Sequence, residues 1–285
     1  MGKKLVLLTD FSWNSWNAIQ YAIRLFKNCE CEFYIMNAYA KEVYGLDSFA
    51  LLDPDEAFNT MSEKRSKERL GDIMERLMLE HENSPYNLQH RFHVLSRSEH
   101  FIDAVKNIVE ELQIDMVVMG AKGISNNYEG RYGKNTLEVI KNIRACPVLV
   151  VPKNVVLDRP EEIVLTTNFN TDLKISEIES LIEIAKISGA SIQVLSLVDN
   201  GSFTLQQKNN KLMLRKYLKG IDHSFNVLHN VEMATALNCF VEIKHSNMIS
   251  YIAKKPSFLE KWGISKSTLG KLGYFEDVPV LALHG

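Results

Sequence analysis

The sequence predicts an α/β protein of two tandem domains, each an open sheet with a parallel five-stranded core flanked by helices. Two observations lead to this prediction. The chain begins "KLVLLTDFSWNSWNAIQYAIRLFKNCECEFYIMNAY" and begins again at Glu162 with "EIVLTTNFNTDLKISEIESLIEIAKISGASIQVLSL", so one strand–helix–strand pattern occurs twice. The two copies also end alike, in "CPVLVVP" (146–152) and "VPVLALH" (278–284). We therefore expect domains at residues 1–153 and 161–285, joined by the proline-containing, charged segment "KNVVLDRPEE".

In the first copy, Ile19, Ile23 and Phe26 follow one another at i, i+4 and i+7, which predicts a helix between the first two strands. A charged helix is expected through about residue 82, followed by a strand at "LQHRFHVL", a helix near 100–112 and a strand at "DMVVMG". Strands that alternate with helices imply right-handed crossovers and a parallel sheet covered on both faces.

The second copy has the same pattern. Its first helix is indicated by Ile178, Leu181, Ile182 and Ala185, at i, i+3, i+4 and i+7. Further helices are expected around 206–218 and 231–243, with strands near "SFNVLH" and at "MISYIA". The two halves should therefore share one topology.

Composition narrows the function classes. The 285 residues are 46% apolar and 24% charged, and the formal net charge is −2, so neither nucleic acid nor an anionic membrane is an expected partner. The start of the chain lacks the pattern of a signal peptide, and no apolar run approaches the length of a membrane span. The four cysteines are scattered, as in a protein of a reducing compartment. We expect a cytoplasmic protein.

The segment "MVVMGAKGISNNYEGRYGKNTLEVI" (116–140) places a glycine-rich loop between a strand and a helix. Gly120 ends the strand, where ligands bind in open parallel sheets. A helix starting near Asn135 would add unpaired N–H groups and a positive dipole end, and Lys122, Arg131 and Lys134 add positive charge. The loop is therefore a candidate phosphate cradle, and the alternative is a flexible loop that only turns the chain.

The loop fits neither common phosphate motif. A Walker loop requires Ser or Thr after its Gly-Lys pair, whereas Asn135 follows Gly133-Lys134, and Tyr128 stands where the earlier glycine is needed. A Rossmann fingerprint would follow the first strand, but "TDFSWNS" contains no glycine.

The spacing Gly120-x2-Gly123-x9-Gly133, followed by "CPVLVVP", resembles the universal stress protein family. The opening "LLTDFSWNSWNAIQYA" is similar to that family's first strand and helix. The specific motifs lie within residues 1–152, and the tandem organisation resembles the two-domain members of the family. The resemblance implies an adenine-nucleotide-binding, Rossmann-like fold. It also implies a pseudo-two-fold relation, because the final strands pair across a dimer in the family and a tandem chain can form that pair internally.

The resemblance further implies an adenine nucleotide, ATP or AMP, with Mg²⁺ if the ligand is ATP. Asp10 matches the acid that contacts the nucleoside, which suits a carboxylate that accepts hydrogen bonds from ribose hydroxyls or an adenine amine. Met36 and Asn37 match the region that lines the adenine pocket. The phosphate loop would comprise Gly120, Lys122, Gly123, Gly133, Lys134, Asn135 and Thr136.

One position departs from the family pattern. Nucleotide-binding members have Ser or Thr directly after the third glycine, whereas this chain has Lys134. A lysine can bind phosphate as a point charge. Alternatively, Lys134 closes the pocket by pairing with Glu129 or Glu138. The second copy departs further: Asn168 replaces the acid, and Pro256 lacks the N–H that a phosphate nest needs.

Two function hypotheses follow. The first is a stress-response regulatory protein that binds an adenine nucleotide in its N-terminal domain. The second is a non-nucleotide interaction scaffold, or a carrier of a small apolar ligand, built as a pseudo-dimer. An enzyme is not expected, although slow ATP hydrolysis occurs in the family. A homodimer or another protein partner is also compatible with the sequence.

Overall fold

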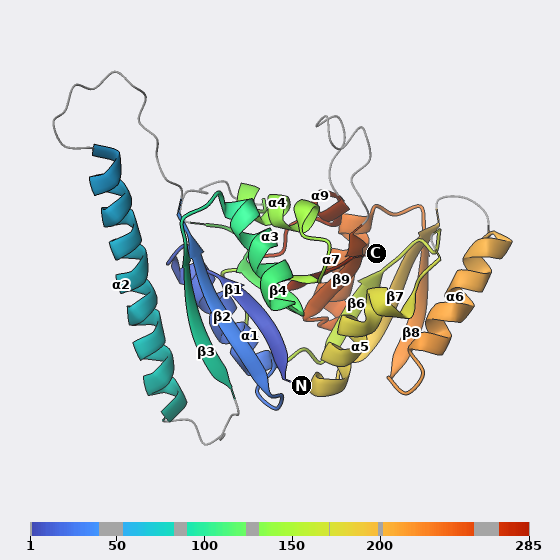
Figure 1. Ribbon diagram of the computed structural model, residues 1–285. Coiled ribbons are helices and arrows are strands. Elements are labelled where there is room, and N and C mark those ends of the chain that lie inside the picture. The colour runs from blue at the N-terminus through green and yellow to red at the C-terminus, as the bar shows by residue number, and fades with distance from the viewer. Residues whose placement is uncertain are drawn as a thin grey trace.

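The computed structural model describes residues 2–39, 54–82, 90–123, 131–170, 172–198, 202–253 and 268–284. Its strands form one sheet in the order β3-β2-β1-β4-β5-β10-β9-β6-β7-β8 (Figure 1). The strands are β1 (Lys3–Leu8), β2 (Cys31–Ala38), β3 (Arg91–Arg97), β4 (Met116–Gly120), β5 (Val148–Val151), β6 (Glu162–Thr166), β7 (Ser191–Val198), β8 (His223–His229), β9 (Met248–Ala253) and β10 (Val280–His284). The helices are α1 (Trp13–Leu25), α2 (Pro54–Glu82), α3 (Phe101–Leu112), α4 (Lys134–Asn142), α5 (Ile175–Ser188), α6 (Leu205–Tyr217), α7 (Met233–Lys244) and α9 (Thr268–Leu272). None of the helices in these ranges is long and apolar enough to cross a membrane.

The two halves have one topology. Read inward from its outer edge, each half runs third, second, first, fourth and fifth strand, with every neighbour parallel. The halves meet where β5 and β10 pair antiparallel, with Leu149 opposite Leu281. These are the leucines of the two "PVL" endings, so equivalent residues face one another across an approximate two-fold axis. The predicted five-stranded parallel cores and their pseudo-two-fold relation are confirmed.

The pairing of β5 with β10 also covers one edge of each half-sheet, which would otherwise be open to other chains. Strand β5 ends at Val151 and β6 begins at Glu162, on either side of the expected linker. The domain limits 1–153 and 161–285 stay a prediction.

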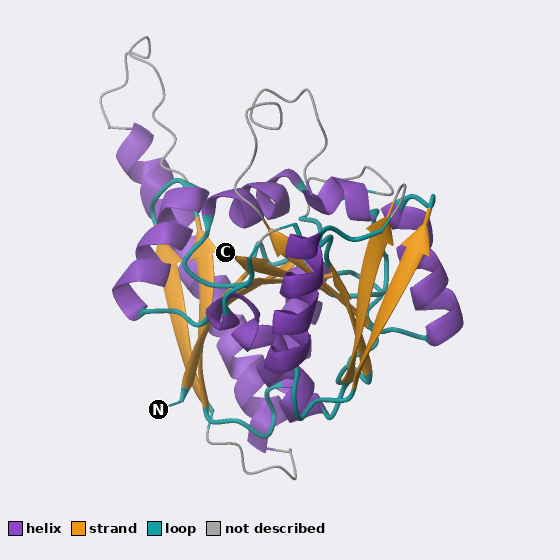
Figure 2. Cartoon of the chain, turned by 90° about the vertical axis from the view of Figure 1, so that its right-hand side faces the viewer, coloured by secondary structure: helices purple, strands orange, loops and turns teal. Residues whose placement is uncertain are grey.

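Both faces of the sheet are covered, as expected for parallel strands (Figure 2). Leu5 and Leu7 of β1 belong to the core shared with α1, α2, α5 and α6. Val6 and Leu8, which point the other way, belong to the core shared with α3, α4, α7 and α9. The near-continuous apolar runs of the sequence thus become strands that are buried on both sides.

Two element boundaries differ from the sequence expectation or extend it. Strand β3 begins at Arg91 and ends at Arg97, later than "LQHRFHVL" suggests, because its pairing with β2 continues to Ala38 opposite Arg97. Helix α2 begins at Pro54, where the missing N–H of proline costs nothing because the first helical N–H has no intrahelical partner. Most of the long excursion between β2 and α2 lies outside the described residues.

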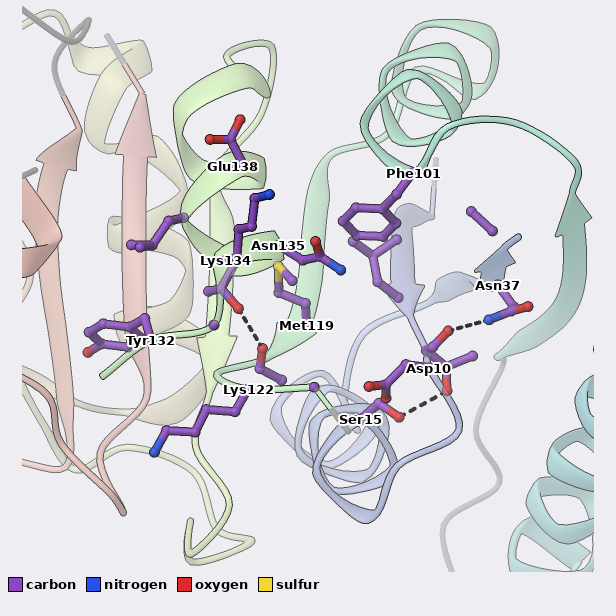
Figure 3. A pocket seen from close by; sticks show the side chains of 18 of the residues that line it. Asp10, Ser15, Asn37, Phe101, Met119, Lys122, Tyr132, Lys134, Asn135 and Glu138 are labelled. Carbon is purple, nitrogen blue, oxygen red and sulfur yellow. Dashed lines mark hydrogen bonds between the residues drawn. The ribbon is translucent and has the colours of Figure 1, made fainter. Parts of the chain in front are cut away.

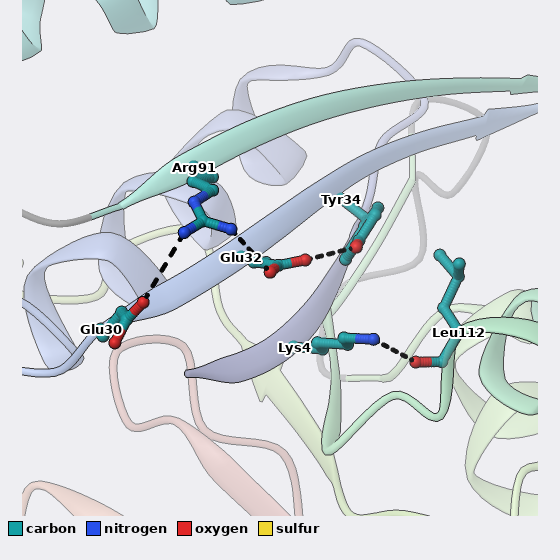
Figure 4. A network of polar contacts seen from close by, with 6 residues as sticks. All are labelled: Lys4, Glu30, Glu32, Tyr34, Arg91 and Leu112. Atoms are coloured by element: carbon teal, nitrogen blue, oxygen red, sulfur yellow. Dashed lines mark hydrogen bonds and ion pairs between the residues drawn. The ribbon is translucent and has the colours of Figure 1, made fainter. Parts of the chain in front are cut away.

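A network of polar contacts joins the amino-terminal ends of β2 and β3 in the first half-sheet (Figure 4). A guanidinium nitrogen of Arg91 lies 3.4 Å from a Glu32 oxygen, and another lies 4.0 Å from Glu30. The Tyr34 hydroxyl donates to Glu32 at 2.7 Å, which lowers the pKa of that carboxyl. Burial and the contact with Glu32 raise the pKa of Tyr34 to about 12. This charged network lies at the amino-terminal ends of β2 and β3, at the opposite end of these strands from their carboxyl termini.

Candidate functional site

A cavity of about 650 Å³ lies at the carboxyl ends of β1, β2 and β4 (Figure 3). The chain places β2 on one side of β1 and returns to place β4 on the other, so the strand order reverses between β1 and β4. This reversal is the position where open α/β sheets bind ligands. Nine of the ten predicted site residues line the cavity: Asp10, Asn37, Gly120, Lys122, Gly123, Gly133, Lys134, Asn135 and Thr136. Their binding roles stay a prediction.

Met36 is the exception, since its side chain is fully buried in the core and does not line the cavity. It contributes its backbone carbonyl, which accepts a hydrogen bond from the N–H of Thr9 at 2.9 Å. Met36 precedes Asn37 and Ala38, which line the cavity at the carboxyl end of β2, so its side chain lies deeper in the sheet. The side chain of Met36 is therefore outside the cavity lining, and a binding role for this position stays a prediction.

Asn37 is held firmly in the wall of the cavity. Its side-chain nitrogen donates to the Thr9 carbonyl at 2.8 Å, and its side-chain oxygen accepts from the Ser66 hydroxyl of α2 at 2.9 Å. These bonds tie β2 to the end of β1 and to the long helix. Asn37 thus shapes the cavity beside Ala38.

Asp10 sits in a tight turn between β1 and α1. Its Oδ1 accepts from the N–H of Ser12 at 3.0 Å, and the Thr9 hydroxyl accepts from the N–H of Phe11 at 3.0 Å. Phe11 adopts a left-handed φ of 65°, unusual for an aromatic residue. Ser12 then caps α1 by accepting from the N–H of Ser15. The turn holds the Asp10 carboxylate at the mouth of the cavity.

Gly123 lies directly against that carboxylate. A β-carbon at position 123 would lie 2.8 Å from Oδ2 of Asp10, closer than non-bonded atoms can approach. Position 120 is similarly close to helix α1, because a β-carbon there would lie 3.2 Å from the side chain of Asn14. Asn14 also donates to the Lys122 carbonyl at 2.6 Å. Both glycines therefore allow the loop to pack against the turn and α1.

The second half repeats the turn without the charge. Asn168 accepts from the N–H of Asn170 at 3.1 Å, Thr167 accepts from that of Phe169 at 3.1 Å, and Phe169 has a φ of 55°. The turn thus needs a side-chain oxygen at this position but not a carboxylate. The second half therefore forms this turn with the neutral amide of Asn168 in the place of the Asp10 carboxylate.

The second half has no glycine at the strand position that corresponds to Gly120. Strand pairing places Gly120 beside Val151 in the first half and Ile252 beside Leu283 in the second, and Val151 and Leu283 are equivalent in the two endings. A branched side chain therefore stands where the first half has a glycine. Pro256, the other expected departure, lies outside the described residues.

Helix α4 points its amino terminus at the cavity. Gly133 is its N-cap, and the N–H groups of the next three residues precede the first intrahelical bonds. Thr136, in contrast, is fully buried, and its hydroxyl donates to the carbonyls of Gly120 and Ala121 at 3.2 and 3.1 Å. Thr136 is thus committed to holding the loop on the helix, so its hydroxyl cannot substitute for the serine or threonine of the family pattern.

The cations around the loop have different surroundings. Lys134 and Arg131 are exposed. Glu138, the expected partner of Lys134, lies 3.8 Å from Lys141 instead, and among the described residues no ion pair joins it to Lys134. Glu129 lies outside the described residues. The Lys122 side chain points away from Asp10 (Figure 3). Its ammonium lies 4.4 Å from the ring centre of Tyr274, in the second half.

The cavity also has walls that the sequence did not indicate, including Leu8, Phe101 and Met119. Phe101 opens helix α3, and helices that follow parallel strands begin at the same edge of the sheet, which is the signal that could have identified it. The site thus combines backbone N–H groups and cations for an anion, a carboxylate for hydroxyl donors, and apolar surface. Within the described residues, no group of three or more His, Cys, Asp or Glu side chains could hold a metal ion.

Comparison with known proteins agrees with this architecture. The model of the universal stress protein family matches residues 1–152. Comparison with curated protein sequences gives no match. Among solved structures, a universal stress protein from Archaeoglobus fulgidus is similar at 15% identity with a TM-score of 0.65, covering 99% of this chain and 96% of that chain. A functionally unknown protein from Pseudomonas aeruginosa is similar at 10% identity with a TM-score of 0.56, covering 99% and 92%. At these identities the structural likeness shows a shared fold along the whole chain.

Proposed function

This chain belongs to the universal stress protein family, and from that premise we propose that it is a stress-response regulatory protein whose first half binds an adenine nucleotide, ATP or AMP. One observation carries the proposal. The cavity at the strand-order reversal is bounded by Gly120 at the end of β4 and Gly123 after it, by the amino terminus of α4 and by the carboxylate of Asp10. The second half keeps the fold, and with Ile252 and Asn168 it is proposed to have no nucleotide site of this kind.

The cavity has residues suited to the phosphates, the ribose and the base of a nucleotide. The phosphates would lie against the backbone of Gly120 to Gly123 and the unpaired N–H groups of α4, where the helix dipole favours an anion. The ribose hydroxyls would donate to Asp10, and the base would lie near Asn37 and Phe101. ATP would bring Mg²⁺ held by its own phosphates, since the described residues include no group of three or more His, Cys, Asp or Glu side chains for a metal ion.

We propose binding rather than catalysis as the role of the site. Of the described residues that line the cavity, none is histidine, and the acids are Asp10 and Glu138. Oδ1 of Asp10 already accepts from the N–H of Ser12, which makes Asp10 a poor general base. Hydrolysis of ATP, where it occurs, would then be slow. Because β5 pairs with β10 within the chain, a second copy is not needed at that edge.

The competing role, a scaffold or a carrier of a small apolar ligand, rests on one feature. Lys134 stands where nucleotide-binding relatives have a hydroxyl, and Thr136 cannot replace that hydroxyl because it is bonded to the loop. A titration of the purified protein with fluorescent ATP separates the two roles. Saturable binding that is displaced by unlabelled ATP or AMP supports the nucleotide proposal, and its absence favours the scaffold or carrier.

Asp10→Asn should separate ligand binding from folding. The turn should remain, because Asn168 already forms it in the second half, so the free energy of unfolding should change by less than about 0.5 kcal/mol. The dissociation constant for ATP should rise about tenfold, since a hydrogen bond to a charged acceptor becomes one to a neutral acceptor. Urea unfolding and titration calorimetry measure the two effects. An unchanged affinity for ATP would show that Asp10 does not contact the nucleotide.

Lys134→Ser should reduce the salt dependence of ATP binding. Lys134 is exposed at the first position of α4, and an exposed ion pair is screened over about 8–10 Å at physiological ionic strength. The serine restores a fixed hydroxyl, so affinity in low salt should be kept or improved while its decline with added salt becomes shallower. Fluorescent ATP titrations from low to high salt measure this.

The matched control is Lys141→Ser, which removes a lysine from the last turn of the same helix. It should leave the salt dependence as in the wild type. Binding gained only in Lys134→Ser would show that the lysine blocks the pocket. If neither the wild type nor Lys134→Ser binds ATP, the nucleotide proposal is contradicted.

A further inference from the structure

Both described ends of the glycine loop contact one residue of the other half, Tyr274. The ammonium of Lys122, just after β4, lies 4.4 Å from the centre of the Tyr274 ring. The ring of Tyr132, just before α4, packs edge-on against the same ring, with centroids 5.0 Å apart and an interplanar angle of 75°. A cation and an aromatic edge thus meet one tyrosine from two ends of the loop.

The backbone of the second half fixes Tyr274 in this place. Helix α9 ends at Leu272, and Gly273 follows with a φ of 94°, a conformation that side chains other than glycine rarely adopt. Phe275, on the other side of Tyr274, is buried in the core. The carbonyl of Glu276 accepts from the N–H of Asn154 in the linker at 3.0 Å. Tyr274 is therefore anchored by the residues that surround it.

The first half has no aromatic residue at the corresponding place in its sequence. Four residues before Cys146 stands Asn142, the last residue of α4, whereas Tyr274, four residues before Val278, lies two residues beyond the end of α9. Asn142 bonds within its own helix, donating to the carbonyl and the carboxylate of Glu138 at 2.8 and 3.0 Å. Tyr274 therefore faces the half that has the glycines, and the residue at the matching place in the first half's sequence bonds only locally among the described residues.

We propose that the second half completes the nucleotide site of the first half, with Tyr274 as the positioning residue that fixes the two ends of the glycine loop. This inference rests on the proposed function. Nucleotide binding requires that residues 121–123 and 131–133 be held in place, and residues already held by Tyr274 lose less conformational entropy when the phosphates bind. Contacts of these two kinds each shift an equilibrium by about two- to tenfold. The tandem arrangement would then contribute to nucleotide binding, because a residue of the second half holds the loop ends of the first half.

The test compares Tyr274→Leu and Tyr274→Phe with the wild type by hydrogen exchange and by ATP titration. Tyr274→Leu keeps apolar volume but removes the ring, so the amides at 121–123 and 131–133 should exchange faster in protein without nucleotide, and ATP should bind about tenfold more weakly. Tyr274→Phe keeps the ring and should match the wild type in both measurements. Tyr217→Leu, at the end of α6 and packed on the second half's own core, is the control and should change neither.

A double variant, Lys122→Met with Tyr274→Leu, measures whether the two residues act together. It should lose less affinity for ATP than Lys122→Met and Tyr274→Leu lose in sum, because each substitution alone already breaks the contact between the two side chains. Unchanged exchange and affinity in Tyr274→Leu would overturn the inference. Tighter ATP binding in that variant would also overturn it, because Tyr274 would then compete with the nucleotide for Lys122.

The exchange measurement separates this inference from the proposed function. If the wild type binds no ATP, the nucleotide proposal fails, and exchange in the unliganded proteins still decides the role of Tyr274. Faster exchange at the loop ends in Tyr274→Leu, restored in Tyr274→Phe, would uphold Tyr274 as the residue that fixes the loop. Equal exchange in all variants would exclude that role whatever the ligand.

Discussion

Gly123→Val is expected to abolish ATP binding and to leave the fold intact. A β-carbon at this position would lie 2.8 Å from Oδ2 of Asp10, so the loop or the carboxylate must move. The carboxylate is tied to the N–H of Ser12, and the branched valine side chain adds bulk where the backbone must approach the phosphates. The substitution thus damages the phosphate cradle and displaces the nucleoside acid together. We expect a loss of affinity of at least about 100-fold, measured by titration calorimetry.

Gly71→Val provides the matched control, since apart from the neighbouring residues and backbone of its own helix no atom lies within 4 Å of the β-carbon it would add. That variant should bind ATP as the wild type does. Circular dichroism should show both variants folded. Affinity in Gly123→Val within about threefold of the wild type would place the phosphates elsewhere.

Leu281→Ala is expected to lower the free energy of unfolding by about 3 kcal/mol, the usual cost of truncating a buried leucine in a packed core. Leu281 is fully buried and lies opposite Leu149, where β10 pairs with β5 in the middle of the sheet. Because the two halves share this sheet, they should unfold together in one transition at a lower urea concentration. Far-UV circular dichroism and tryptophan fluorescence both follow the transition, and two of the tryptophans, Trp13 and Trp16, report on α1 of the first half.

Leu212→Ala removes the same atoms from an exposed position on α6, where the side chain is 53% exposed. Its effect should stay within about 0.5 kcal/mol. A similar loss in both variants would mean that the junction of β5 and β10 does not support the core. Separate transitions for the two halves would mean that they fold independently.

The sequence predicts the fold well because the chain repeats its signals. The apolar strands, the helical spacing of residues such as Ile178 and Leu181, and the paired "PVL" endings all agree on one topology. The ends of the elements are harder to predict than their presence. The extent of β3 is set by its pairing with β2 and not by its own apolar pattern. Local patterns determine which elements form, and the partner strand determines where each one stops.

Site residues could be predicted from the sequence where a local motif marks them. Gly120 stands out because a glycine at the end of a buried strand indicates a close approach of the backbone to another group, and Gly123 follows it in the loop. The structure identifies the neighbouring groups as Asn14 for Gly120 and Asp10 for Gly123. The place of Met36 outside the cavity lining could not be predicted, because the sequence does not show which residues at the end of β2 reach the cavity.

Two further features needed the three-dimensional structure. The hydroxyl of Thr136 is bonded to loop carbonyls that precede it by 15 and 16 positions. Tyr274 comes from the other half of the chain and meets Lys122 and Tyr132 only because β5 pairs with β10. No local motif indicates contacts of this kind.

The central claim is one adenine nucleotide per chain, bound in the first half. Native mass spectrometry of the intact protein with increasing ATP tests it most directly, because it counts bound nucleotides on each chain. We expect a single added nucleotide that saturates in the wild type and disappears in Gly123→Val. A second nucleotide of similar affinity, a single nucleotide that persists in Gly123→Val, or no bound nucleotide at any concentration would contradict the claim.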